Sequence, residues 1–279
     1  MQRARLGRTL AKMKTFIKIY DDIVSKVKFF YKQLKLDKQE KSTGRPLAIT
    51  NIETISLALY KQANGIPTKK SIHRTFRPNC AYKTLVVNMN RLAMKALLIL
   101  LAIIRFNRDT SHPIKHVDST DIPVCLNKNA KHHKTMCDLA EWGRNGKGFY
   151  YGLKLRIATD LKRNLLSVAF TPGNTDDRKP VKKLVADMTG IFVADAGYIS
   201  QTLANEIHVE GKRLLMARAK RNMKKLWSEM QEKIYDTRML IELNFRNLKM
   251  FYDLVTSLPR SIDGYLANYV YSLLGYVLA

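Results

Sequence analysis

Three acidic residues in this 279-residue chain have the type and spacing of metal ligands. Asp118 lies within an apolar stretch, and Asp195 directly follows another. Glu242 lies further on, in a segment of helical periodicity. Carboxylates on separate elements suit Mg²⁺ or Mn²⁺, which accept few carboxylates and complete their shells with water and phosphate oxygens. Two such ions can activate an attacking oxygen and stabilise the leaving oxygen during phosphoryl transfer.

Glu242 is set among basic and aromatic residues at helical spacing. On one helix spanning 234–252, with about 100° per residue, an arc of about 60° holds Tyr235, Arg238, Glu242 and Lys249. Arg246 extends this stripe. Beside it lies an apolar face made of Ile234, Ile241, Phe245, Leu248 and Tyr252. We therefore expect the carboxylate to bind a metal ion and the neighbouring cations to bind phosphates.

Short apolar runs predict strands, of which one carries Asp118 and another directly precedes Asp195. They are His116–Val124, Phe149–Thr159, Leu165–Thr171, Ile191–Ala194 and Arg213–Ala217. Helical stretches at 177–188 and 199–210, and the long one through Glu242, separate or follow the later strands. This order predicts an α/β domain with a mixed sheet, and it places Asp195 at the carboxyl edge, where ligands bind.

The N-terminal part has the pattern of an all-α region. Helical spacing covers residues 15–36, a polar stretch follows at 37–46, and helical spacing resumes from Thr50. The turn at 64–68 then precedes a basic helix, 69–76, which we expect to display Lys69, Lys70, His73 and Arg74. Two helices around a glycine turn are the outline of a helix-turn-helix, and a last helix covers 82–106. We divide the chain into a helical DNA-binding region, 1–110, and a catalytic domain, 111–279.

The overall charge points to a polyanionic partner. Lys and Arg number 49 against 23 Asp and Glu, a formal net charge of +26 spread along the chain, while 46% of the residues are apolar. Nucleic acid is the first candidate and an anionic membrane surface the second. The longest apolar run, 96–104, is shorter than the roughly 20 residues that span a bilayer, so we expect a buried helix there.

Other residues could also form parts of a site. The basic segment 212–225 is either a solvated loop or, as we favour, a track for the DNA backbone that includes Lys220, Arg221, Lys224 and Lys225. Asp121 is the main rival to Asp118, but strand alternation puts the two on opposite faces, so both cannot serve. A zinc site is not expected, because the spacing of Cys125, His132, His133 and Cys137 fits no standard site. Trp142 and Trp227 could stack on unpaired bases, although packing is the expected role of each.

Four motifs together resemble a known family. The spacing Tyr235-x2-Arg238-x3-Glu242-x6-Lys249 is similar to the Tyr-Arg-Glu-Lys signature of bacterial insertion-sequence transposases with an Asp-Asp-Glu triad. Segments 118–125, 171–178 and 194–199 resemble three further motifs of the insertion-sequence 982 family. One position departs from that family, which usually has lysine where this chain has Ala196.

The resemblance implies a ribonuclease H-like catalytic domain in which Asp118, Asp195 and Glu242 hold two Mg²⁺ or Mn²⁺ ions. It implies a DNA transposase that cuts and joins strands without a covalent protein–DNA intermediate. Its partners would be the terminal inverted repeats of the transposon, the target DNA and further copies of the chain, in the bacterial cytoplasm at the nucleoid and without a membrane. The alternatives are a decayed or truncated copy that only binds DNA, favoured by Ala196 and the early end at Ala279, and a host metal-dependent nuclease of the same fold.

Overall fold

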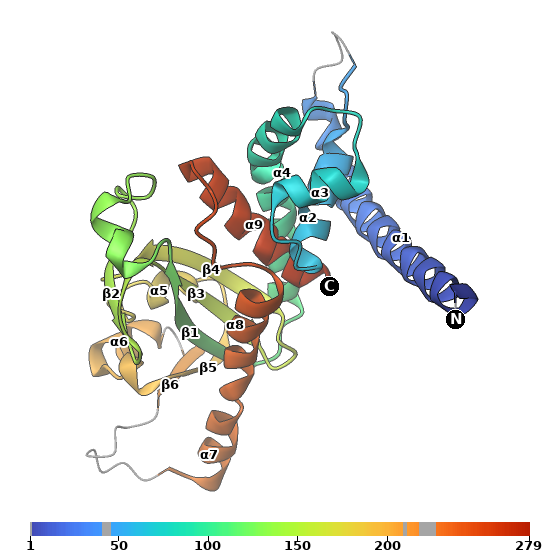
Figure 1. Cartoon of the computed structure of the whole chain (residues 1–279). Helices are drawn as coiled ribbons and strands as arrows, with labels where there is room; N and C mark the ends of the chain where they lie inside the picture. Colours follow the sequence, from blue (N-terminus) through green and yellow to red (C-terminus); the bar gives the residue numbers. More distant parts are fainter. Residues whose placement is uncertain (1, 41–45, 209–210, 218–226) are drawn as a thin grey trace. The chain divides into compact units, whose positions relative to one another are not determined.

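The computed structural model describes residues 2–40, 46–208, 211–217 and 227–279, with the backbone alone for 2–15 and 39. The chain forms two compact units. The first combines residues 1–101 with 250–254 and 263–279, and the second combines 102–249 with 255–262. Figure 1 shows the helices of the first unit and the sheet of the second.

The first unit is helical, as predicted. Its described elements are α1 (Gln2–Gln33), the 3-10 turn η1 (Asp37–Gln39), α2 (Asn51–Ala63), α3 (Lys69–Phe76), most of α4 (Tyr82–Asp109) and α9 (Ile262–Leu278). Side-chain caps define where α2 and α3 begin, because the Thr50 and Thr68 hydroxyls accept hydrogen bonds from the third backbone amide of each helix. The expected pair of helices around a turn is therefore present.

Helix α9, which was not predicted from the sequence, belongs to this first unit. The Gln62 side-chain amide of α2 donates to Asn268 Oδ1 at 3.0 Å and to Ser272 Oγ at 2.8 Å. The Tyr271 hydroxyl donates to the Met89 carbonyl of α4 at 2.9 Å. These hydrogen bonds, of which those of Ser272 and Tyr271 are buried, fix α9 against α2 and α4.

Helix α4 contains the longest apolar run of the chain. By length and composition it is the one helix within the described residues that could cross a membrane. Its buried side chains recur every three or four residues, for example Leu85, Met89, Ala96 and Ile99. That spacing is typical of a helix with one face in a protein core.

The second unit is built on a mixed sheet. Its strands are β1 (Ile114–Pro123), β2 (Glu141–Asn145), β3 (Gly148–Asp160), β4 (Leu165–Pro172), β5 (Gly190–Ala194) and β6 (Arg213–Ala217). The order is β2-β3-β1-β5-β6, and β4 also pairs with β3. Strands β1 to β4 pair antiparallel, whereas β5 pairs parallel with β1 and β6. Antiparallel strands followed by parallel ones in this order, preceded by helices, are consistent with a ribonuclease H-like fold.

The five predicted strands match five of these six to within a few residues. Strand β2 was missed, although Asn145-Gly146 is a strong hairpin signal between it and β3. The helix predicted for 177–188 is wrong in extent, since only one turn forms, α5 (Val181–Leu184). The helix predicted for 199–210 is α6 (Gln201–Ile207), preceded by the 3-10 turn η3 (Ala196–Tyr198).

The helix predicted for 234–252 is interrupted. It forms as α7 (Glu229–Asp236) and α8 (Met239–Phe251), which run end to end in Figure 1. At the break, the Thr237 hydroxyl donates to the Ile234 carbonyl at 2.6 Å and lies 2.8 Å from His116 Nε2. Hydrogen bonds three residues apart replace the helical pattern there, including Arg238 N to Tyr235 O at 2.9 Å. The Thr237–His116 contact explains why the helix tightens at this position.

Helices cover both faces of the sheet. Val117, Phe192 and Ala194 form a core with side chains of the α5 and α6 region, which are Leu184, Val185, Met188, Leu203 and Ile207. His116, the strand neighbour of Val117, points the other way and contacts Thr237. The predicted apolar face of α8 is buried at Ile241, Phe245 and Leu248.

Candidate functional site

The sheet register brings Asp118 and Asp195 to the same edge. Strands β1 and β5 are parallel neighbours, and Val117 is paired with Ala194. Pairing ends there, so Asp118 and Asp195 are the next residues of the two strands. The carboxyl ends of parallel strands are where ligands bind in open α/β sheets. The predicted proximity of these two acids therefore follows directly from the strand pairing.

Asp118 is largely buried, with 17% of its side chain exposed. Its Oδ1 accepts a hydrogen bond from the Ser119 backbone amide at 2.8 Å, and its Oδ2 lies 3.4 Å from Arg238 Nη1. Burial raises the pKa of this carboxyl to about 7, against the lowering effects of the Ser119 amide and Arg238. The negative charges of Asp195 and Asp177 raise it further.

Arg238 contacts two of the predicted ligands, Asp118 and Glu242, and is influenced by the charge of the third, Asp195. Its Nη2 donates to Glu242 Oε1 at 2.8 Å, while its Nη1 faces Asp118. Burial acts against the charge of this guanidinium, but nearby negative groups, led by Asp118 and Asp195 and including Glu242, raise its pKa. One cation thus contacts Asp118 and Glu242 and responds to the charge of Asp195.

The remaining signature residues lie along α7 and α8. Lys249 Nζ forms an ion pair with Asp121 Oδ1 at 3.1 Å. Both aspartates of β1 therefore have a basic partner from the signature, Arg238 for Asp118 and Lys249 for Asp121, although strand alternation predicted opposite faces for them. The Tyr235 and Trp227 rings pack edge to face with centroids 5.4 Å apart, and Arg246 is exposed. The predicted DNA contacts Lys220, Arg221, Lys224 and Lys225 lie outside the described residues.

The predicted ligands Asp118, Asp195 and Glu242 offer carboxylate oxygens, which are the donor atoms that hard divalent cations such as Mg²⁺ prefer. Across the described ranges, no group of three His, Cys, Asp or Glu side chains forms a ready-made metal site. Asp118 and Glu242 instead share the Arg238 guanidinium. The three cysteines are unpaired thiols, and the described residues assemble no zinc site from the Cys125 to Cys137 segment.

Asp177 is a further acid at this site and was not among the predicted ligands. Its Oδ1 accepts hydrogen bonds from Ser119 Oγ at 2.9 Å, Lys154 Nζ at 3.0 Å and Arg156 Nη2 at 3.1 Å. Arg156 is fully buried and also donates to the Thr175 carbonyl at 2.9 Å. One sequence feature could have indicated a buried acid here: Lys154 and Arg156 lie two residues apart in an apolar strand, so both cations are on the same face of β3.

Only some of the basic residues of α3 are displayed at the surface, contrary to the expectation that all four would be. Lys69 Nζ donates to Asn90 Oδ1 at 2.6 Å, and burial, with a contribution from Lys61, lowers its pKa to about 8. The His73 ring nitrogen is 2.8 Å from the Cys80 carbonyl. These two side chains are turned to the protein rather than displayed, whereas Lys70 and Arg74 are exposed.

Comparison with known protein families matches residues 108–262 to the transposase DDE domain. This match covers more than half of the chain, which therefore belongs to the DDE transposase family. A search of curated proteins finds no match. Family membership identifies a transposase, whose substrate is DNA and whose class generally uses divalent metal ions.

Proposed function

We propose that this chain is the DNA transposase of an insertion sequence, resembling the insertion-sequence 982 family, and that Asp118, Asp195 and Glu242 are its catalytic residues. The observation that carries this assignment is the position of Arg238, which contacts Asp118 and Glu242 and is influenced by the charge of Asp195. One cation thus bridges acids of β1 and α8, next to the acid that follows β5. A structural role does not require such an arrangement.

The residues around this edge have distinct roles in the proposal. Two Mg²⁺ or Mn²⁺ ions, when bound, supply activation of the attacking oxygen and stabilisation of the leaving oxygen. Asp118 and Asp195 would hold both ions, and Glu242 would complete one site. Tyr235, Arg238, Arg246 and Lys249 then hold the phosphates of the DNA end, because their cationic and hydroxyl groups line the same helical pair.

The proposal also covers the whole chain and its setting. The helical region 1–110 binds the transposon ends, with Lys70 and Arg74 of α3 facing the DNA, and the domain 111–279 cuts and joins strands. The partners are the terminal inverted repeats, the target DNA and other copies of this chain. The reaction takes place in the bacterial cytoplasm, at the nucleoid, and requires no membrane.

Strand cleavage of DNA carrying the terminal repeats of the element tests this function. The full chain with Mg²⁺ or Mn²⁺ should nick these ends, and Asp118→Asn, Asp195→Asn or Glu242→Gln should lower the rate by about a thousandfold or more, as loss of a group that stabilises transition-state charge does. Asp187→Asn is the matched control, because this exposed acid pairs with Arg108 away from the site. Full activity of Asp195→Asn would refute the assignment. Binding without cleavage by the wild type would indicate an inactive copy, and cutting without end specificity a nuclease.

A further inference from the structure

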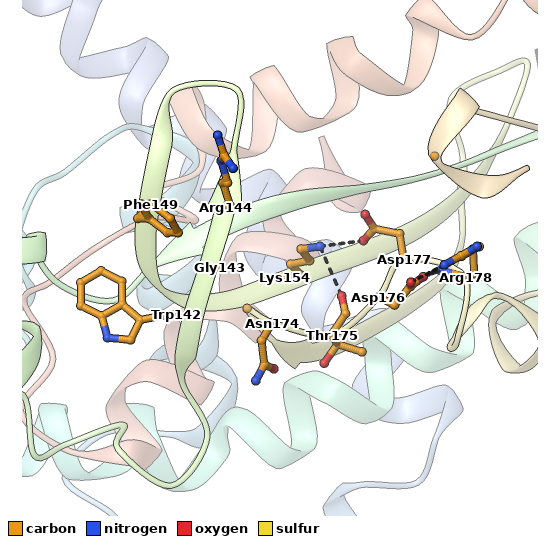
Figure 2. A pocket seen from close by; sticks show the side chains of 12 residues that line it. Trp142, Gly143, Arg144, Phe149, Lys154, Asn174, Thr175, Asp176, Asp177 and Arg178 are labelled. Carbon is orange, nitrogen blue, oxygen red and sulfur yellow. Dashed lines mark hydrogen bonds and ion pairs between the residues drawn. The ribbon is translucent and has the colours of Figure 1, made fainter. Parts of the chain in front are cut away.

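A pocket of about 390 Å³ lies beside the candidate active site, between the β2–β3 hairpin and the segment after β4 (Figure 2). Its lining residues from the hairpin and β3 are Trp142, Gly143, Arg144, Phe149 and Lys154. Those from the segment after β4 are Gly173, Asn174, Thr175, Asp176, Asp177 and Arg178. Its volume is in the range of about 300–1,000 Å³ typical of sites for one small ligand, and too small for a duplex.

Two aromatic rings border the pocket and are exposed. Phe149 is 64% exposed and Trp142 is 44% exposed. They lie on one face of the hairpin, because Trp142 pairs with Tyr151 and Arg144 pairs with Phe149. The Arg144 guanidinium lies 5.7 Å from the centre of the Phe149 ring. Exposed aromatic rings beside an arginine are the combination that binds bases by stacking and phosphate by charge.

Two of the three cations that line the pocket are held by ion pairs. Lys154 and Arg178 have carboxylate partners, Asp177 at 3.0 Å and Asp176 at 2.7 Å. Arg144, the third cation of the lining, instead contacts the Phe149 ring, and the described residues give it no carboxylate partner. The exposed Asn174 amide adds both a donor and an acceptor for a base edge. In Figure 2, Arg144 and Asn174 lie above and below Gly143, the Lys154–Asp177 pair lies beside it, and the Arg178–Asp176 pair lies further away.

The pocket borders the candidate active site at two points. Asp177, on its wall, accepts a hydrogen bond from Ser119, the residue after Asp118. Gly197, also in its lining, follows Asp195 by two residues. A DNA strand positioned at the three carboxylates would therefore have a neighbouring nucleotide within reach of this pocket.

We propose that this pocket binds an unpaired nucleotide next to the phosphodiester that is cut, with its base stacked against Trp142 and Phe149 and its phosphate bound by Arg144. The inference rests on the proposed function, since it assigns a part of the same DNA to a new site. The occupant is single-stranded DNA rather than duplex, because stacking on a side chain requires a base outside the double helix.

Binding of single-stranded DNA in EDTA tests the pocket separately from catalysis. The probes are a fluorescein-labelled dT12 oligonucleotide and a duplex of the same length, each titrated with the full chain. Trp142→Leu and Phe149→Leu should each weaken dT12 binding about tenfold or more, because each removes a stacking surface but retains apolar bulk. Trp142→Tyr should retain most of the affinity, and duplex binding should change less than twofold.

Phe106→Leu is the matched control, because this phenylalanine is 67% exposed and lies outside the pocket. If the two pocket variants bind dT12 as tightly as Phe106→Leu does, the proposal is wrong. Equal losses for dT12 and for duplex would also refute it, since they would indicate a general DNA surface. The measurement needs no cleavage, so an inactive chain would refute the proposed function and still give a result for the pocket.

Discussion

Two adjacent aspartates show how position, rather than residue type, decides what a carboxylate does. Asp177 is half-buried and accepts hydrogen bonds from Ser119, Lys154 and the fully buried Arg156. Its neighbour Asp176 pairs with the exposed Arg178, which lowers the pKa of Asp176. The first holds the segment after β4 against β1, and the second forms a surface ion pair.

Replacing Asp177 with Asn should therefore destabilise the fold, because Arg156 and Lys154 would lose their shared anion. Breaking a buried ion pair from one side costs about 3–5 kcal/mol, and about 3 kcal/mol is expected for this partly exposed acid. Urea unfolding measures the free energy. Asp176→Asn is the control and should have little effect, since exposed pairs contribute little. Equal losses of unfolding free energy for the two variants would show that the hydrogen bonds of Asp177 with Arg156 do not stabilise the fold more than a surface ion pair does.

His116 makes the second unit sensitive to acid. Burial lowers its pKa to about 4 from an ordinary value of about 6.5, and the nearby Asp160 does not compensate. As pH falls from about 6.5 to about 4, the unfolded chain takes up a proton that the folded chain does not, so stability falls. The loss between pH 7.5 and pH 5 should be on the order of 2 kcal/mol.

Unfolding of His116→Gln at the same two pH values checks this assignment. The variant removes the titrating group, so the part of the pH dependence due to His116 should disappear. His132→Gln, at an exposed position, should keep the slope of the wild type. A His116→Gln slope identical to that of the wild type would contradict the account.

Residue-level prediction from the sequence worked where the information was local. Asp195 after an apolar run could be placed at the carboxyl edge because strand ends are marked by neighbouring residues. The role of Asp177 could not be predicted, because it depends on Arg156 and Ser119, which are distant in the sequence. Lys69 was expected at the surface, but its burial depends on Asn90 of another helix.

At the scale of elements, the close approach of β1 and β3 depends on one glycine. A Cβ added at Gly152 would lie 2.1 Å from the Ile122 carbonyl oxygen. This oxygen belongs to the backbone of β1, so it cannot move without distorting the strand that carries Asp118. Gly152 is therefore required by space rather than by a left-handed conformation.

Gly152→Ala should lower the free energy of unfolding by about 1–3 kcal/mol, the usual cost of overpacking, and should also reduce cleavage. Gly146→Ala is the matched control, because no atom lies within 4 Å of its added Cβ. Thermal unfolding of both variants measures the difference. A wild-type melting temperature for Gly152→Ala would show that β1 and β3 can separate without cost.

Apolar spacing in the sequence was sufficient to predict some features of the helices and not others. The apolar face of α8 was predicted because Ile241, Phe245 and Leu248 recur with the helical period. The break at Thr237 was not, because it arises from a contact with His116 on another element. Helix α5 was predicted too long, and a buried Val185 just after its single turn keeps the apolar spacing without a helix.

At the scale of the molecule, the division into units does not follow the order of the sequence. The family match ends at residue 262, and α9 follows it but belongs to the helical unit. The sequence pattern alone did not predict this, because α9 is apolar on most sides and its partners, Gln62 and Met89, lie far away in the chain. The helical unit thus depends on both ends of the chain.

Removing residues 263–279 should therefore destabilise the helical unit and spare the sheet. The deletion exposes the core positions filled by Tyr265, Tyr269 and Leu273 and removes the acceptor of the Gln62 amide in Ser272. Each fully buried large side chain contributes about 1.5–3 kcal/mol, which is enough in sum to unfold a marginally stable unit.

Hydrogen exchange followed by mass spectrometry measures both units in one sample. Amides of α2 and α4 should exchange much faster in the shortened chain, whereas β1, β3 and β5 should keep their protection. Tyr271→Phe in the full chain is a milder test, since it removes one buried hydroxyl and should cost about 1 kcal/mol in the same region. Unchanged protection of α2 after the deletion would mean that the helical unit folds without α9.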